Sequence, residues 1–160
     1  TVTVGSGIDN GAGNGVGNIG TSSSYFNTVF AKATSAQYAD LAEKYTADVE
    51  YEPGTVVSFG GDAEVTKSTT NGDRRVAGVV STNPSYIMNG TLEGTVATVA
   101  LTGRVPTKVT GTVRKGDLMV SNGDGTARAE ENPAIGSVIG KALENFDGAT
   151  GTIEVVVGRF

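Results

Sequence analysis

The sequence contains no cysteine, no histidine and no tryptophan among its 160 residues. Without cysteine the chain can form no disulfide, no thiolate nucleophile and no cysteine-based zinc or iron–sulfur site. Without histidine it lacks the commonest general acid–base group and the Ser-His-Asp and Cys-His catalytic arrangements. Aromatic residues make up only 6% of the chain, which leaves little material for stacking against sugars. We therefore expect a protein that is not an enzyme and needs no cofactor.

Charged residues are also scarce, at 18%, and the formal net charge is −5 with no run of Lys or Arg. A nucleic-acid partner is not expected, because the basic patch that would neutralise phosphates is missing. No stretch approaches the length of an apolar membrane span and no signal-peptide pattern opens the chain, so we predict no membrane insertion. The opening residues 1–5 lack an initiator Met, and we expect a fragment or a processed product of a longer protein.

Glycine, by contrast, is abundant, with 24 residues. Thr and Val are also frequent, and both favour strands because a branched Cβ fits the pleated surface of a sheet. Many glycines together with many β-branched residues predict a mainly β protein with short strands and tight turns.

Residues 1–34 are predicted to form an extended, glycine-rich shaft segment. So many positions without a Cβ can bury little apolar surface within one chain, and a flexible linker is the alternative. Tyr25, Phe26, Val29 and Phe30 nevertheless need a surface to pack on. A homotrimer would supply it, since three thin chains can share one core. These four residues are the first part of a predicted trimer interface.

A short helix is predicted over residues 35–45, followed by a connector to residue 50. Ser35 is an acceptable N-cap, and Tyr38, Leu41 and Tyr45 fall on one face at helical spacing. An isolated helix of this length is marginal, so it must dock on something. Two possibilities stay open: a connector packed over a barrel, or a three-helix collar at a trimer axis, with these three apolar residues in the interface.

Residues 51–160 are predicted to hold a duplicated, hairpin-rich β-domain, a barrel or a sandwich, with repeats at about 51–105 and 113–160. Gly54 and Gly116 are 62 residues apart, and so are Gly78 and Gly140. The expected hairpin tips are residues 60–62 and residues 122–125, which are rich in the Gly, Asn and Asp that positive-φ turns require.

Two kinds of acidic group are candidate sites in this sequence. Residues 71–73 and 122–125 offer oxygen atoms to calcium, but neither completes an EF-hand loop, and hairpin turns explain both. Glu130 and Glu131 would point to opposite faces of an extended chain, which is poor geometry for paired catalytic carboxylates. We therefore predict no catalytic residue and no metal ligand.

A surface contact is predicted at Tyr86, Ile87 and Met88, which follow Pro84 in an expected loop. Such an apolar trio is typical of a contact patch for a neighbouring subunit or a host receptor. The alternative is that it covers the open end of the barrel.

Several motifs occur in a familiar order along the chain. They comprise residues 38–45, 52–57, 76–84, 103–109, 115–118 and 139–144. In this order they resemble the C-terminal domain of phage tail-fibre and appendage proteins, and the resemblance covers about residues 19–160. It implies a structural virion protein, a homotrimer located in a tail fibre or appendage and assembled in the host cytoplasm. Its expected partners are itself, other virion proteins and a host cell-surface receptor.

The chain is also distantly similar to the appendage domains grouped as G2 peptidases, around residues 38–45 and 76–81. That resemblance implies the alternative function, an autoproteolytic intramolecular assembly chaperone. The sequence departs from that pattern because it ends after its last expected strand, with no long helical chaperone segment.

Overall fold

The computed structural model describes residues 3–13, 16–21, 23–29 and 39–158. They belong to two units, Thr1–Ser35 and Ala36–Phe160. In the first unit the described residues form local turns only. The Asn10 side chain accepts a hydrogen bond from the Ala12 amide at 3.1 Å and donates one to the Gly13 carbonyl at 2.8 Å. Thr21 and Ser24 form an isolated antiparallel bridge.

Ten β-strands build the second unit, and residues 39–158 contain no helix, so the mainly β prediction is right. The strands are β1 (Asp40–Thr46), β2 (Val56–Phe59), β3 (Val65–Lys67), β4 (Val76–Val80), β5 (Tyr86–Met88), β6 (Val96–Val113), β7 (Leu118–Ser121), β8 (Ala127–Ala129), β9 (Val138–Ala142) and β10 (Phe146–Val157). Within the described ranges, no helix has the length and apolar character to cross a membrane.

The predicted helix is wrong, because its last six residues, 40–45, lie in β1. This strand pairs with β6 along its whole length in antiparallel register and with β5 in parallel register. Sheet pairing on both sides satisfies the backbone of a segment too short to be a stable helix alone. Residues 35–38 of the predicted helix, including Tyr38, lie outside the described residues.

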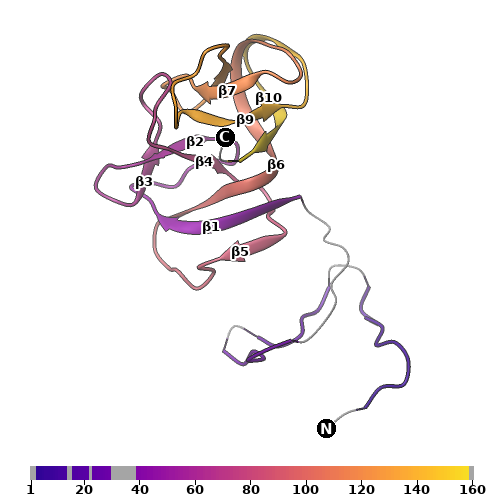
Figure 1. Ribbon diagram of the computed structural model, residues 1–160. Coiled ribbons are helices and arrows are strands. Elements are labelled where there is room, and N and C mark those ends of the chain that lie inside the picture. Colours follow the sequence, from indigo (N-terminus) through magenta and orange to yellow (C-terminus); the bar gives the residue numbers. More distant parts are fainter. Residues whose placement is uncertain (1–2, 14–15, 22, 30–38, 159–160) are drawn as a thin grey trace. The chain divides into compact units, whose positions relative to one another are not determined.

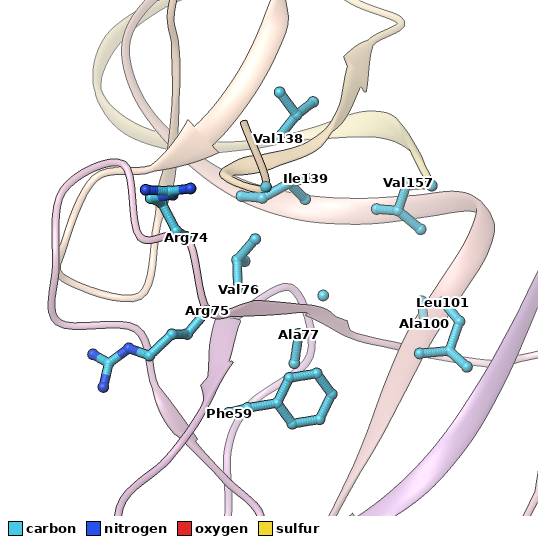
Figure 2. Close-up of a pocket in the computed structure, with 13 residues that line it drawn as sticks. Phe59, Arg74, Arg75, Val76, Ala77, Ala100, Leu101, Val138, Ile139 and Val157 are labelled. Atoms are coloured by element: carbon cyan, nitrogen blue, oxygen red, sulfur yellow. The ribbon is translucent and has the colours of Figure 1, made fainter. Parts of the chain in front are cut away.

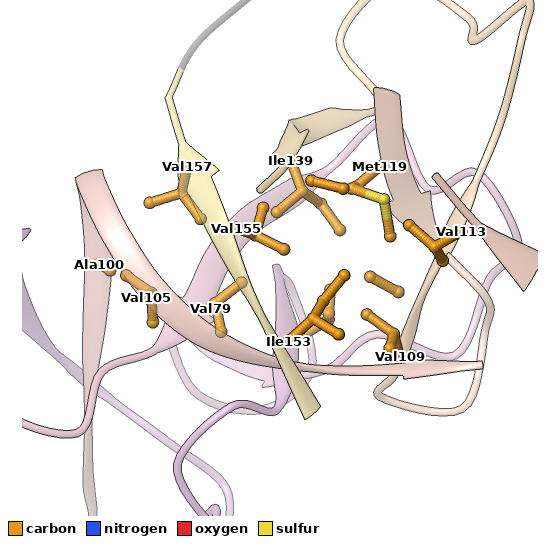
Figure 3. Packing of buried hydrophobic residues seen from close by; sticks show 13 residues of the cluster. Val79, Ala100, Val105, Val109, Val113, Met119, Ile139, Ile153, Val155 and Val157 are labelled. Atoms are coloured by element: carbon orange, nitrogen blue, oxygen red, sulfur yellow. The ribbon is translucent and has the colours of Figure 1, made fainter. Parts of the chain in front are cut away.

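One closed barrel contains the C-terminal half of β6 followed in order by β8, β7, β9 and β10, which pairs again with β6. Its interior is apolar. Figure 3 shows Val109, Val113, Met119, Ile153 and Val155 pointing toward one another, and all five are buried. Below we call this ring the second barrel.

A first barrel uses the N-terminal half of β6, which pairs with β4 and β1, while β4 continues to β2 and β3. A single parallel bridge between Ala47 and Val65 closes the ring between the end of β1 and β3. The long strand β6 therefore belongs to both barrels, and in Figure 1 it runs from the β1 and β5 side to β7 and β10.

The strand pairings of the first barrel recur 62 residues later in the second. The pair Val57–Gly78 corresponds to Met119–Gly140, and a bulge follows Val57 just as one follows Met119. The same shift turns the closing bridge Ala47–Val65 into Val109–Ala127. The equivalent of β1 is thus a stretch of β6, and the first ring begins in the segment for which a helix was predicted.

The expected hairpin tips lie between paired strands. Residues 60–64 connect β2 to β3, and residues 122–126 connect β7 to β8. The two barrels also bond to each other near these tips: the Val56 amide donates to the Gly125 carbonyl, and the Gly72 amide donates to the Ser121 carbonyl, both at 2.8 Å.

Candidate functional site

The predicted contact trio forms the short strand β5. Tyr86 pairs with Leu41 of β1, Ile87 with Ala42, and Met88 with Glu43. The Tyr86 side chain is 62% exposed and that of Ile87 is 42% exposed, while Met88 is half-buried. The trio therefore displays two large apolar groups on a strand.

Hydrogen bonds on both sides hold β5 in place. The amide and hydroxyl of Ser85 both donate to the Asp40 carbonyl at 2.8 Å. After the strand, the Lys44 ammonium donates to the Gly90 carbonyl at 2.8 Å, and the Asn89 amide donates to the Lys44 carbonyl at 3.1 Å. The exposed side chains thus stand on a pre-organised support, which lowers the entropy cost of binding.

The outer edge of β5 is open, because among the described strands β5 pairs with β1 only. An unpaired edge presents backbone donors and acceptors that can take up another strand, and alternate side chains then add specificity. The edge of β5, with Tyr86 and Ile87, therefore has the chemistry of a protein-binding surface.

The predicted trimer-interface residues fall into three groups. Tyr25, Phe26 and Val29 are described, and their side chains are 77%, 64% and 71% exposed. Phe30 and Tyr38 lie outside the described residues. Leu41 and Tyr45 lie half-buried on β1.

Tyr45 packs inside its own chain, edge-on against Phe59 with ring centroids 5.5 Å apart. Its hydroxyl donates to the Glu43 carboxylate at 2.7 Å. A role for Tyr45 in an interface remains a prediction, and the structure gives it a role in the first barrel as well.

A cavity of about 340 Å³ lies at the seam between the two barrels and was not foreseen from the sequence. In Figure 2, Phe59 and Ala77 of the first barrel and Ile139 and Val157 of the second line it, while the side chain of Arg75 points away. The only sequence signal for it is the Arg74–Arg75 doublet beside β4.

Asp73 holds Arg75, the second residue of this doublet. Its buried carboxylate accepts hydrogen bonds from the Arg75 amide at 2.9 Å and from the Arg75 Nε at 3.3 Å. Burial acts to raise the pKa of Asp73, but the hydrogen bonds from Arg75 help to hold the pKa below its ordinary value. Arg74 Nε donates to the Ile135 carbonyl at 3.0 Å, which links the doublet to the second barrel. Arg74 therefore connects the two barrels, while Arg75 is held by Asp73.

The acidic groups of the second hairpin are engaged locally. Asp124 accepts from the Thr126 hydroxyl at 2.6 Å and from its amide at 2.9 Å, and the hydroxyl bond is the main cause of its lowered pKa. Glu130 accepts from the Asn132 amide and from Arg128 at 3.0 Å, and these bonds lower the pKa of Glu130. Among the described residues, no three acidic side chains gather in a group that could hold a metal ion.

The comparisons with known proteins show a likeness to a solved structure. No family model and no curated protein match the chain. Among solved structures, the N base of head fiber gp8.5 in bacteriophage phi29 is similar, with a TM-score of 0.43 and 16% sequence identity. The match covers 72% of this chain and 92% of that one. The similar protein is thus a phage head fiber.

Proposed function

We propose that the chain is a structural module of a phage virion, a tail-fibre or appendage component that assembles as a homotrimer. One observation carries the proposal: large apolar side chains of the first unit are exposed in the single chain. Ile8 is 87% exposed, Ile19 is 88% exposed, and Tyr25 is 77% exposed. The ordered motifs between residues 38 and 144 resemble those of fibre-terminal domains. This resemblance supports the proposal that the assembly is a tail fibre or appendage.

Burial of these side chains is the physical reason for assembly. Covering one large apolar side chain contributes about 1.5–3 kcal/mol, and a segment with this much glycine cannot cover such side chains by folding on itself. Three copies of Tyr25, Phe26 and Val29 around one axis would offset the entropy lost on association.

The two barrels then present the open edge of β5 to a further partner. We propose that this partner is another virion protein or a receptor on the host surface, since an exposed Tyr and Ile on an open edge fit a protein surface. In this proposal the module is assembled in the host cytoplasm, works in the virion, binds no nucleic acid, does not enter a membrane, and acts without catalysis or a cofactor.

The assembly is tested by replacing Tyr25 and Phe26 together with Ser and measuring mass by sedimentation equilibrium. Loss of two aromatic anchors per copy should raise the dissociation constant of the trimer at least about tenfold, equivalent to about 1.4 kcal/mol. The matched control is Val49→Ser, because Val49 is also exposed, at 53%, but lies in the second unit. Assembly unchanged by the double substitution would remove the first unit from the interface.

The contact is tested separately with Ile87→Ser and Tyr86→Ser, by measuring binding of the purified protein to host cells and to fibre-less particles. Each substitution should weaken binding and leave the native mass unchanged. Retained binding in both variants would assign the contact to another surface.

A further inference from the structure

A second cavity, of about 300 Å³, lies at the junction of the barrels and is lined by polar side chains from both. Asp40 at the start of β1 and Ser81 just after β4 come from the first barrel. Glu154 of β10 and Arg104 of β6 come from the second. We call this cavity the acidic pocket.

Three side-chain oxygen atoms of this pocket are buried without a hydrogen-bond partner: Asp40 Oδ2, Ser81 Oγ and Glu154 Oε2. The residue Asp40 is only 5% exposed and Ser81 only 7%. Buried polar atoms are nearly always paired, and leaving one unpaired is costly, most of all for a charged group. That three such atoms line one pocket indicates a common partner.

The described chain does not supply this partner. Arg104 lines the pocket, yet it forms none of the ion pairs found among the described residues. The Ser85 amide and hydroxyl reach Asp40 only through its backbone carbonyl. The occupant must therefore bring positive charge, or several donors, from outside these segments.

We propose that the acidic pocket binds a hard divalent cation that keeps part of its water shell. Carboxylate and hydroxyl oxygens are the ligands that Mg²⁺ and Ca²⁺ prefer, and Mg²⁺ is commonly held by one or two carboxylates with waters completing its coordination. The sequence has neither His nor Cys, the ligands that softer metals select. The volume of the pocket suits a partly hydrated ion better than a bare one.

The ion would connect the two barrels. Asp40 and Ser81 approach it from the first barrel and Glu154 from the second, so binding would stabilise their junction. A cation that binds only the folded state raises the unfolding temperature in proportion to the logarithm of its concentration above its dissociation constant.

The experiment is calorimetric unfolding of the whole chain, first with a chelator and then with about 5 mM MgCl₂ or CaCl₂, against NaCl of equal ionic strength. The divalent salts should raise Tm by about 3–8 °C above the NaCl control. No divalent-specific rise would overturn the proposal, and so would an equal rise with ethylammonium chloride, because an organic ammonium would then be the ligand.

Substitutions assign any shift to the pocket. Asp40→Asn and Glu154→Gln should each abolish most of the rise, whereas the control Glu131→Gln, an exposed carboxylate outside the pocket, should keep it. Arg104→Gln should lower the apparent dissociation constant several-fold, because it removes a positive charge from the site.

If Asp40→Asn fails to fold, Glu154→Gln and titration calorimetry on the unaltered protein still decide the matter. A rise that persists in Glu154→Gln, or weaker binding in Arg104→Gln, would contradict the proposed site.

Discussion

The two barrels share one pairing scheme and differ in how they are filled. The larger apolar cluster is centred on the second barrel and contains Met119, Ile139 and Ile153 among its buried members. The cluster of the first barrel contains only Ala and Val as buried members, with Tyr45 and Tyr51 packed against it from the side. The same backbone design therefore tolerates two different interiors.

The two interiors differ most at one pair of equivalent positions. Tyr51 of the first barrel and Val113 of the second are 62 residues apart and occupy the same place in the repeat. Val113 is fully buried in the apolar core. The Tyr51 hydroxyl instead donates to Asp48 and accepts from the Lys67 amide at 2.9 Å. Thr66 also donates to Asp48, at 2.8 Å. The first barrel thus replaces apolar filling near its closure with a polar network.

Both barrels contain one close approach between two backbones. In the first barrel β4 approaches β6, and in the second β9 approaches β10. A Cβ at Gly78 would overlap the carbonyl oxygen of Ala100, and a Cβ at the equivalent Gly140 would overlap that of Val156. Both glycines oppose the residue that precedes the bulge. The glycines fix the shared skeleton, while the side chains around them differ.

Substitution of these two glycines should cause the largest loss of stability. Gly78→Ala and Gly140→Ala should each cost about 3 kcal/mol or more of unfolding free energy, because backbone atoms would have to move. Chemical denaturation measures the loss. Gly90→Ala is the control, since its nearest neighbours are 3.9 Å from an added Cβ, and it should change stability by less than about 0.5 kcal/mol. A small effect at Gly140 would break the claim of a shared skeleton.

The next effect separates the two interiors. Met119→Ala should cost about 2–5 kcal/mol, and the equivalent Val57→Ala less, about 1–3 kcal/mol, because fewer buried atoms are removed. Both side chains are fully buried. Urea unfolding of the two variants gives the comparison directly, and a larger loss for Val57→Ala would place the main core in the first barrel.

Tyr51→Phe should cost about 1–2 kcal/mol at neutral pH, since it leaves the Lys67 amide without its side-chain acceptor and removes one of the donors to Asp48. Thermal unfolding measures it. The control is Tyr86→Phe, whose exposed hydroxyl has no partner among the described residues. If both substitutions change the unfolding temperature equally little, the polar network around Tyr51 does not contribute to stability.

The smallest expected effect is a pH dependence of the stability difference between the unaltered protein and Tyr51→Phe. The Tyr51 hydrogen bond is the main cause that holds the pKa of Asp48 below its ordinary value. A lowered folded pKa contributes stability that is present above the unfolded pKa and lost as pH falls through the folded pKa. The stability gap between the unaltered protein and Tyr51→Phe should therefore narrow below about pH 4. A gap that widens in acid would contradict this.

The sequence predicted the parts of this fold that depend on local chemistry. Frequent Gly, Val and Thr indicated a mainly β chain, and the glycines at 60, 61, 123 and 125 do adopt positive φ in the two hairpin tips. The anchors 62 residues apart indicated a duplication, and the registers recur at that spacing.

The errors came from long-range pairing. Residues 40–45 have helical spacing, but β6 and β5 flank them in space, and neither partner is close in the sequence. The sharing of β6 by both barrels is likewise invisible to a local pattern. The acidic pocket was missed for the same reason, because Asp40, Ser81 and Glu154 meet only through the fold.

The most direct test of the proposed trimer is the native mass of the unaltered chain, measured by sedimentation equilibrium over about a hundredfold dilution. A homotrimer should give a folded species near 49 kDa, three times the chain mass of 16.2 kDa. A folded species of 16.2 kDa at every concentration would contradict it and leave the exposed aromatic side chains of the first unit without a partner.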